Sequence, residues 1–551
     1  MDFIKKNLGF IVVLILGIIP LYSLLHPGLP LTHDGQDHVA RIANFYQSLS
    51  EGNLVPRWAA NLDWGYGHPI LMFLYPFSSY TASFFHLLGF SFVDSLKIIF
   101  GLGFVLSGVF MYLWIRNMLG EKEAIFASIL YMFAPYRFVD LYVRGAIGEH
   151  MAFIFPPLIC YFLLKLVSKR SYWNLLGATI SIAFLVLSHN ALLIMFLPFI
   201  IFYGTYLIFT NKKESKRLIV DYLTALVIGF GLSAFFIVPA FLEGKYTLRD
   251  IVTGSETLTR FVTLAQVIYS PWNYGQSGTF SVQLGIAEWI SFLAFPFVIY
   301  KLKKNKDNLY LYIFTLVYLV GSIFIMLPES AFIWKTITTL QKFQFPWRFL
   351  SSAVFGVAIL GGYLIFVVNK KISGWVLIVL SLIAVLATVT YWVPKAYLYK
   401  PETFYTSIYN GTTDTGESAP IWSIRFMEKK ADAPAEVIDG AANIKNLSRT
   451  STKHEYEIKA KYRSRIRENT LYFPGWKVYI DGKNYEGIQF QDPNNRGLIT
   501  YYVLPGKHVV SVVFQNTRIR TISNLVSVLS VILLFVLYFV YNSNIFVKKK
   551  K

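Results

Sequence analysis

Long apolar segments separated by short basic clusters constrain this chain more than any other feature of its sequence. A helix that crosses the hydrocarbon core of a bilayer needs roughly 20 mainly apolar residues. Thirteen segments approach that length, near residues 7–25, 71–90, 95–115, 124–139, 151–167, 174–188, 190–209, 218–241, 285–301, 308–327, 349–368, 374–393 and 522–541. Only 15% of the 551 residues are charged, whereas soluble proteins carry roughly 25%. The sequence therefore predicts a polytopic α-helical membrane protein with about 12 to 13 transmembrane segments.

The basic clusters predict which loops face the cytoplasm, because Lys and Arg are enriched in cytoplasmic loops. These clusters lie at 5–6, 169–170, 212–217, 301–306, 370–371 and 548–551. Both termini are then cytoplasmic, which requires an even number of crossings, so one of the thirteen segments should not cross fully. Polar side chains within 71–90 favour that segment over 95–115, and we expect twelve true spans.

Composition and motifs exclude several functional classes. The net charge of +20 does not indicate nucleic-acid binding, because the basic residues flank apolar segments instead of forming a basic groove. The one cysteine, Cys160, lies within an apolar segment, so no intrachain disulfide can form. The sequence has no nucleotide-binding loop and no H-E-x-x-H or G-x-S-x-G motif. A nucleotide-driven pump is therefore not indicated.

The hydropathy pattern divides the chain into three parts. Residues 1–394 are the predicted transmembrane domain, 395–520 an extracytoplasmic β-rich domain, and 521–551 the final helix with a basic cytoplasmic tail. The loops expected on the outer side are 26–70, 136–150 and 243–284.

Three patterns predict strands in the hydrophilic part of the chain. Residues 455–461 alternate between polar and apolar, 471–480 form a run that ends at Asp481-Gly482, and 501–514 are expected to hold a strand pair about Pro505-Gly506. An Asp-Gly dipeptide between such runs is a strong hairpin signal.

The loop 26–70 holds the richest cluster of polar side chains. Asp34 is placed to cap a helix that begins there. Asp37, His38 and Arg41 follow at spacings that put all four side chains on one helical face. Such a set could hold a divalent cation or a phosphate, or place a general base beside an anionic leaving group. The alternative is a capped, solvated surface helix without chemistry.

The loop 136–150 is short and highly charged, with Asp140, Arg144 and Glu149. Because it is short, it should lie close to the first outer loop when the helices bundle, and a shared polar cavity of opposite charges would result. The alternative is that Asp140 and Glu149 cap the adjoining helices.

Two further arginines are candidate phosphate ligands. Arg57 and Arg348 both lie on the outer side, against the usual charge bias, and a guanidinium binds phosphate through two parallel hydrogen bonds. Anchoring at the membrane interface explains these side chains nearly as well.

Two sets of residues carry a family resemblance. The first comprises His33-Asp34-Gly35-Gln36-Asp37-His38, Pro56-Arg57-Trp58, Tyr142-Val143-Arg144-Gly145-Ala146 and Glu149. It resembles the bacterial membrane proteins called 6-pyruvoyl-tetrahydropterin-synthase-related. The second comprises Phe473-Pro474-Gly475-Trp476 and Leu504-Pro505-Gly506-Lys507-His508, and it resembles the outward C-terminal domain of YfhO-type membrane proteins.

The resemblance implies the GT-C architecture of polytopic glycosyltransferases, not pterin synthesis. GT-C proteins place an essential acid in the first outer loop and take sugar from a polyprenyl-phosphate carrier. Asp34 matches that acid by position, and Asp37 is its neighbour. The spacing here is Asp-x-x-Asp and departs from a strict Asp-x-Asp, which leaves the requirement for a metal open.

The resulting hypothesis is a sugar transfer at the outer face of the bacterial cytoplasmic membrane, from a polyprenyl-phosphate sugar to an extracytoplasmic acceptor. Asp34 would act as general base with Asp37 beside it. The expected ligands of the donor phosphate are Arg41, Arg57, Arg144 and Arg348. His38, Glu149 and Asp140 are candidates for holding the acceptor or a divalent Mg or Mn ion, with Asp34, Asp37 and His38 as the candidate metal ligands. The alternatives are a lipid or polysaccharide transporter and a non-catalytic envelope assembly protein.

Overall fold

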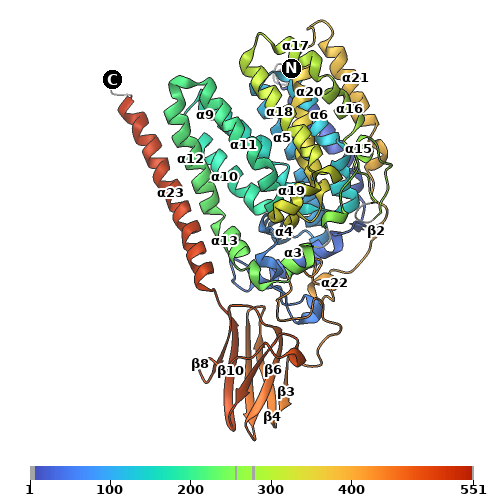
Figure 1. The fold of residues 1–551 in the computed structure, drawn as a ribbon. Helices are drawn as coiled ribbons and strands as arrows, with labels where there is room; N and C mark the ends of the chain where they lie inside the picture. Colours follow the sequence, from blue (N-terminus) through green and yellow to red (C-terminus); the bar gives the residue numbers. More distant parts are fainter. Residues whose placement is uncertain (1–6, 255–256, 276–278, 549–551) are drawn as a thin grey trace.

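The computed structural model describes residues 7–254, 257–275 and 279–548, with side chains up to residue 541. A bundle of helices occupies one end of the molecule and a β-sandwich the other (Figure 1). The last helix, α23 (Arg518–Lys548), begins beside the sandwich and runs along the bundle (Figure 1). The predicted class, a polytopic helical protein with a β-rich region before the final helix, is confirmed.

Eight helices in the described ranges are long and apolar enough to cross a membrane. They are Leu8–Leu25 (α2 with η1), Phe92–Met118 (α5), Ile147–Ser168 (α8 and α9), Asn190–Thr210 (α11), Lys306–Phe324 (α18), Pro346–Val367 (η10 and α20), Ser373–Tyr391 (α21 and η11) and Arg518–Tyr541 in α23. Two bent pairs raise this number to ten if each pair is one span: Glu121–Phe133 with Pro135–Arg144, and Lys212–Leu232 with Ala234–Leu242.

At most ten candidate spans are found, fewer than the twelve expected, because two of the twelve apolar segments form shorter helices. Segment 71–90, which the sequence already favoured as the one that does not cross fully, yields only α4 (Pro76–Leu87), whose 12 residues rise about 18 Å and cannot cross a core of about 30 Å. Segment 285–301 breaks into α16 (Ile286–Leu293) and α17 (Phe295–Leu302), with a proline in the first turn of α17. The third short helix is α10 (Tyr172–Ser188).

Helix α20 (Leu350–Val367) forms the centre of the bundle. It is apolar on every side and buried from Leu350 to Ile365, as expected for a helix surrounded by other helices. Small residues let its neighbours approach closely: a Cβ at Gly361 would lie 2.3 Å from Leu130 of helix α6 (Glu121–Phe133). The helix therefore has a fixed position, and Arg348 directly precedes its first turn.

The β domain is a sandwich of two antiparallel sheets. One has the strand order β4-β5-β10-β7-β8 and the other β3-β6-β9. The strands are β3 (Ala435–Asp439), β4 (Ala442–Arg449), β5 (Lys453–Ala460), β6 (Ser464–Leu471), β7 (Trp476–Ile480), β8 (Lys483–Tyr485), β9 (Leu498–Val503) and β10 (Gly506–Phe514).

Of the two hairpin turns predicted for this domain, one is confirmed and one is wrong. Asp481-Gly482 joins β7 to β8 with positive φ at both residues, 53° and 77°, as a tight hairpin requires. The strands on either side of Pro505-Gly506 also exist, but they are not a pair: β9 pairs with β6, and β10 pairs with β5 and β7. The predicted hairpin is therefore wrong, since this turn passes the chain from one sheet to the other.

The first outer loop joins the sandwich to the bundle. Trp58 packs edge-on against Trp476 with ring centroids 5.3 Å apart. Asp63 is 1% exposed, and its Oδ1 accepts a hydrogen bond of 2.9 Å from the backbone N–H of Met427. A second connection is the buried ion pair between Arg520, at the start of α23, and Glu243, which follows helix α13 (Ala234–Leu242), with a distance of 2.8 Å. Loop 26–70 is thus part of the domain interface.

Burial raises the pKa of Asp63 from 3.8 to about 6. The folded protein therefore binds this proton more tightly than the unfolded chain, so stability decreases as pH rises from about 4 to about 6. We expect Asp63→Asn to raise the free energy of unfolding at pH 7.5 by up to about 3 kcal/mol, and with it the unfolding temperature. The hydrogen bond from Met427 is kept, because an amide oxygen can still accept it. The difference from wild type should shrink at pH 5 in thermal unfolding of the detergent-solubilised protein. An equal or lower unfolding temperature at pH 7.5 would contradict this explanation.

Candidate active site

The first and second outer loops meet through their backbones at the start of helix α3 (Gly35–Ser50). The N–H groups of His33 and Asp34 donate to the carbonyls of Val143 and Arg144, both at 2.9 Å. Gly145 makes this approach possible, since its φ is +68° and a Cβ there would lie 2.3 Å from Thr32 Oγ1. The predicted closeness of the two loops is therefore found in the structure.

Asp34 precedes the first turn of α3, as the sequence predicted, but its side chain makes no capping bond. Its carboxylate has no hydrogen-bond or ion-pair partner within the described part of the chain. The side chain is exposed, yet the surrounding protein removes enough water to raise its pKa, an effect that the nearby Arg144 partly offsets. Asp34 is thus an accessible, partly dehydrated carboxyl group that is free to accept a proton.

The other polar residues of α3 are already engaged. Asp37 Oδ1 accepts a 2.6 Å hydrogen bond from the Tyr409 hydroxyl, and burial raises the pKa of Asp37. Arg41 lies 3.1 Å from His38 Nδ1 and also donates to the backbone and side chain of Thr413. Burial and the charge of Arg41 hold the pKa of His38 well below its usual value, so this imidazole is neutral.

A buried network of two arginines and two carboxylates lies next to Asp34. Arg144 donates a hydrogen bond to Asp140 at 2.5 Å. It also donates to both carboxylate oxygens of Glu149 through its two terminal nitrogens, at 2.7 and 2.9 Å. Arg348 donates to the same Glu149 carboxylate at 2.7 Å. Glu149 therefore holds the two guanidinium groups together and compensates part of their charge.

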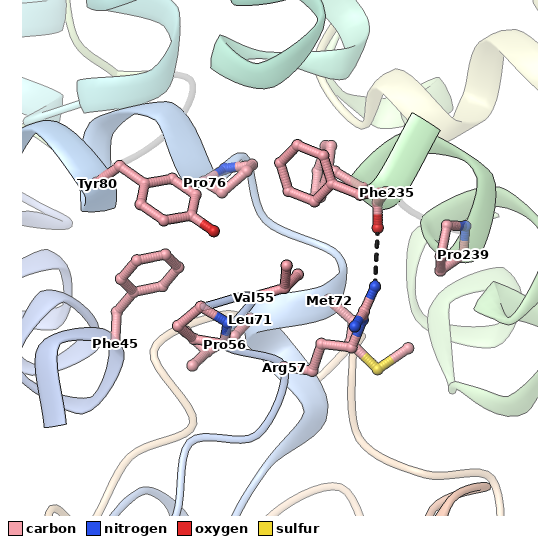
Figure 2. A pocket seen from close by; sticks show the side chains of 11 residues that line it. Phe45, Val55, Pro56, Arg57, Leu71, Met72, Pro76, Tyr80, Phe235 and Pro239 are labelled. Atoms are coloured by element: carbon pink, nitrogen blue, oxygen red, sulfur yellow. Dashed lines mark hydrogen bonds between the residues drawn. The ribbon is translucent and has the colours of Figure 1, made fainter. Parts of the chain in front are cut away.

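The predicted phosphate ligands divide into two groups. Arg144 and Arg348 share Glu149, and Nη2 of Arg348 has no hydrogen bond to the residues described. Arg57 lies elsewhere: it donates to Phe235 O at 3.0 Å and to two asparagines at 2.9 Å, Asn516 and Asn524. Figure 2 shows it pointing toward Phe235 of helix α13 (Ala234–Leu242). Its role is to hold α13 and α23 together, and Arg41 is likewise committed to Thr413.

Several residues of this region were not predicted as site residues. The ring of Tyr75 stacks on His189 at 4.9 Å and fits against Gly148, where a Cβ would lie 2.2 Å from it. Trp347 lies under the Arg144 guanidinium at 4.5 Å. Tyr409 and Thr413 come from the segment between α21 (Ser373–Leu386) and the β domain. The polar run Tyr409 to Asp414 was the signal that could have indicated them.

The candidate metal ligands are not gathered around one point. The described residues contain no group of three or more His, Cys, Asp or Glu side chains that could hold a metal ion. Asp37 faces Tyr409, and the His38 ring faces Arg41. The residues present therefore do not fit a resident divalent ion, and the Mg or Mn ion stays an untested prediction.

Comparison with known proteins gives a family and several similar structures. Residues 71–398, more than half of the chain, match the family model described as "6-pyruvoyl-tetrahydropterin synthase related domain; membrane protein". This range includes Arg144, Glu149 and Arg348, and begins after Asp34. An uncharacterized protein of Lactococcus lactis subsp. cremoris (strain MG1363) is 26% identical over 246 residues, which are 43% of this chain and 40% of that protein. The chain thus matches less than half the length of this relative.

Three similar solved structures are found, and the chain covers between 28% and 68% of each of them. They are arabinofuranosyltransferase AftD from Mycobacteria (TM-score 0.47, 14% identity, 72% of this chain and 28% of that one), ArnT from Cupriavidus metallidurans bound to undecaprenyl phosphate (0.41, 14%, 73% and 68%) and the apo oligosaccharyltransferase of Archaeoglobus fulgidus (0.45, 13%, 76% and 62%). At TM-scores below 0.5, the likeness says nothing about the activity of this chain.

Removal of Glu149 would leave the buried Arg144 and the partly buried Arg348 without their shared counter-ion. We expect Glu149→Ala to destabilise the folded protein by about 3–5 kcal/mol, the usual result of breaking a buried ion pair from one side. The measurement is thermal unfolding in detergent, with Glu329→Ala as control, since Glu329 is exposed and makes no ion pair with the residues described. If both variants unfold at the wild-type temperature, Glu149 does not organise the site.

Proposed function

Because the chain belongs to the 6-pyruvoyl-tetrahydropterin synthase related family of membrane proteins, and an unengaged carboxylate lies beside its arginine network, we propose that it is a membrane glycosyltransferase. It moves a sugar from a polyprenyl-phosphate donor to an acceptor on the extracytoplasmic side. The family name is not evidence of pterin chemistry. The observation that carries the proposal is Asp34, accessible and without a partner among the described residues, next to Arg144.

Asp34 is the general base in this proposal. Its carboxylate takes the proton of an acceptor hydroxyl while the hydroxyl oxygen forms a bond to the anomeric carbon of the donor sugar. The bond from that carbon to the phosphate oxygen breaks, and the electron pair leaves with the polyprenyl phosphate. An attack opposite to the leaving group inverts the configuration of the anomeric carbon. Dehydration of Asp34 favours this role, since it makes the carboxylate a stronger base than an ordinary aspartate.

The arginine network stabilises the leaving phosphate. Negative charge grows on the phosphate as the glycosidic bond breaks, and fixed cations lower the energy of that state without reorganising. Glu149 holds Arg144 and Arg348 in place before the donor arrives. Nη2 of Arg348 is the donor group available to a phosphate oxygen, because the described residues do not occupy it.

The position of these arginines suits a lipid-linked donor. Glu149 and Arg348 lie in the first turns of two candidate spans, Ile147–Ser168 and Pro346–Val367. A polar group at the end of a spanning helix lies at the level of lipid headgroups, where the phosphate of a polyprenyl carrier is found. The lipid chain can then lie along the apolar surface of the bundle.

The orientation that we propose places the site outside the cytoplasm of a bacterial cell. The basic cluster 301–306 lies between α17 and α18, and α17 lies at the end of the bundle opposite to the β domain (Figure 1). The end of α23 lies there as well (Figure 1). Basic loops at that end face the cytoplasm under the positive-inside rule, which puts the β domain and Asp34 on the other side.

Asp34→Asn is the decisive test of the base. Asparagine is nearly isosteric, and the carboxylate makes no bond that would be lost, so the variant should insert and fold normally. We expect turnover of a polyprenyl-phosphate sugar by membranes containing the variant to fall by about 10²–10⁴-fold. A panel of such sugars is offered to membranes with wild type, Asp34→Asn and the control Glu486→Gln, whose exposed side chain lies on the β domain. Wild-type turnover by Asp34→Asn, or no turnover by any stably inserted protein, would reject the proposal.

The acidic limb of the pH–rate profile provides an independent test. Burial raises the pKa of Asp34 above 3.8, and the base works only when ionised. We therefore expect kcat/KM to fall with decreasing pH at an apparent pKa above that of an ordinary aspartate. The measurement is kcat/KM between pH 4 and pH 8 for the donor identified above. A profile that stays flat down to pH 4 would contradict Asp34 as the base.

A further inference from the structure

A cavity of about 380 Å³ lies where loop 26–70 meets the β domain. Its volume falls in the range of small-molecule sites, roughly 300–1,000 Å³. Four parts of the chain line it: the end of α3 with loop 60–66, Ile408, segment 430–434, and the sandwich through Arg449 and Asn469. It is separate from the arginine network, because none of the network residues lines it.

The lining combines aromatic faces with unused hydrogen-bonding groups. Trp64 and Tyr66 are half-buried, and neither the Trp64 indole N–H nor the Tyr66 hydroxyl has a partner among the described residues. Asn469 is 3% exposed, and its Nδ2 donates to Ala433 O at 2.7 Å and to Glu436 at 2.8 Å. These two bonds fix the amide, and its Oδ1 is enclosed by protein. The unpartnered groups open to a ligand are therefore those of Trp64 and Tyr66.

The charge in the cavity does not favour an anionic ligand. The Arg449 guanidinium is compensated by the buried Glu468, 2.9 Å away. Lys430 and Asp432 at the rim are exposed and have opposite signs. The ligand that fits is therefore uncharged overall, with both apolar faces and many hydroxyl groups. Sugar rings have this composition, since their C–H faces pack on aromatic rings and their hydroxyls bond amides and indole N–H groups.

The backbone at the cavity is strained. Asp63 and Trp64 have positive φ values of 52° and 59°, which non-glycine residues rarely adopt. Two hydrogen bonds hold them there, from Asp63 N to Gly411 O at 2.8 Å and from Trp64 N to Tyr409 O at 2.9 Å. Strain of this kind is typical of functional sites. Tyr409 also binds Asp37 through its hydroxyl, so one residue connects the cavity to the catalytic loop.

We propose that this cavity binds a saccharide chain and holds the acceptor glycan at a distance from the reacting hydroxyl. The identity of the bound glycan as acceptor rests on the proposed function, whereas the binding itself does not. Gln47 in the lining lies on the same helix as Asp37 and thirteen residues beyond Asp34, which corresponds to about 20 Å along α3. A site at that distance recognises an extended oligosaccharide and not a single sugar.

Fluorescence anisotropy with labelled linear hexasaccharides of glucose, galactose, rhamnose and N-acetylglucosamine tests the proposal on the full-length protein in detergent. We expect at least one of these probes to bind, and Trp64→Ala to weaken that binding by about tenfold or more. Trp64→Phe keeps an aromatic face and should retain most of the affinity, which separates a lost contact from a misfolded loop. The matched control is Tyr462→Ala, since Tyr462 is 59% exposed on the β domain outside the cavity.

Binding by wild type of none of the four probes, or equal binding by Trp64→Ala and wild type, would overturn the proposal. Asp34→Asn is expected to bind the probe as wild type does, because Asp34 does not line the cavity. Transfer activity without saccharide binding would refute this site and leave the proposed function standing. Saccharide binding that depends on Trp64, without transfer activity, would support this binding site and refute the proposed function.

Discussion

The pairing of Glu149 with both Arg144 and Arg348 is the interaction on which the candidate site of this protein depends. It joins the second outer loop to the start of the central helix α20, two parts of the chain that are 199 residues apart. The backbone of Arg144 then accepts the N–H of Asp34, so the same guanidinium residue positions the candidate base. Two like charges can lie this close only because a buried carboxylate lies between them. The fold thereby keeps two paired guanidinium groups beside one carboxylate, Asp34, that has no partner among the described residues.

Helix α3 sets the distance between Asp34 and the β domain. Its first residue follows Asp34, and its far end lies at the junction with the β domain, where Glu51 accepts hydrogen bonds from Ser451. The segment around Tyr409 runs beside it and bonds to Asp37 and to the strained turn at Trp64. Helix α3 and the segment around Tyr409 therefore hold the proposed base and the proposed saccharide cavity at a fixed separation, as binding a long acceptor would require.

Sequence reasoning identified the residues of the candidate site better than their partners. Asp34, Arg144, Glu149 and Arg348, which the structure brings together, were all named as candidates, since charged residues near apolar segments are rare and stand out. The one-face pattern of α3 suggested a joint metal or phosphate site, but Asp37 binds a tyrosine that is 372 residues away. Arg57 resembled the other outer arginines in sequence, yet it ties α13 to α23. Local sequence spacing does not distinguish an arginine with a free hydrogen-bond donor from one whose donors are already bonded within the protein.

The sequence by itself determined the membrane class, the β-rich region before the last helix and the helix start at Asp34. These features follow from local hydropathy, strand alternation and capping preference, which depend on neighbouring residues only. The tertiary structure decided how many apolar segments become full spans, which sheet each strand of 498–514 joins, and which charges neutralise one another. Those outcomes depend on contacts between residues hundreds of positions apart, and the energy of a buried charge is set by such contacts and not by its place in the chain.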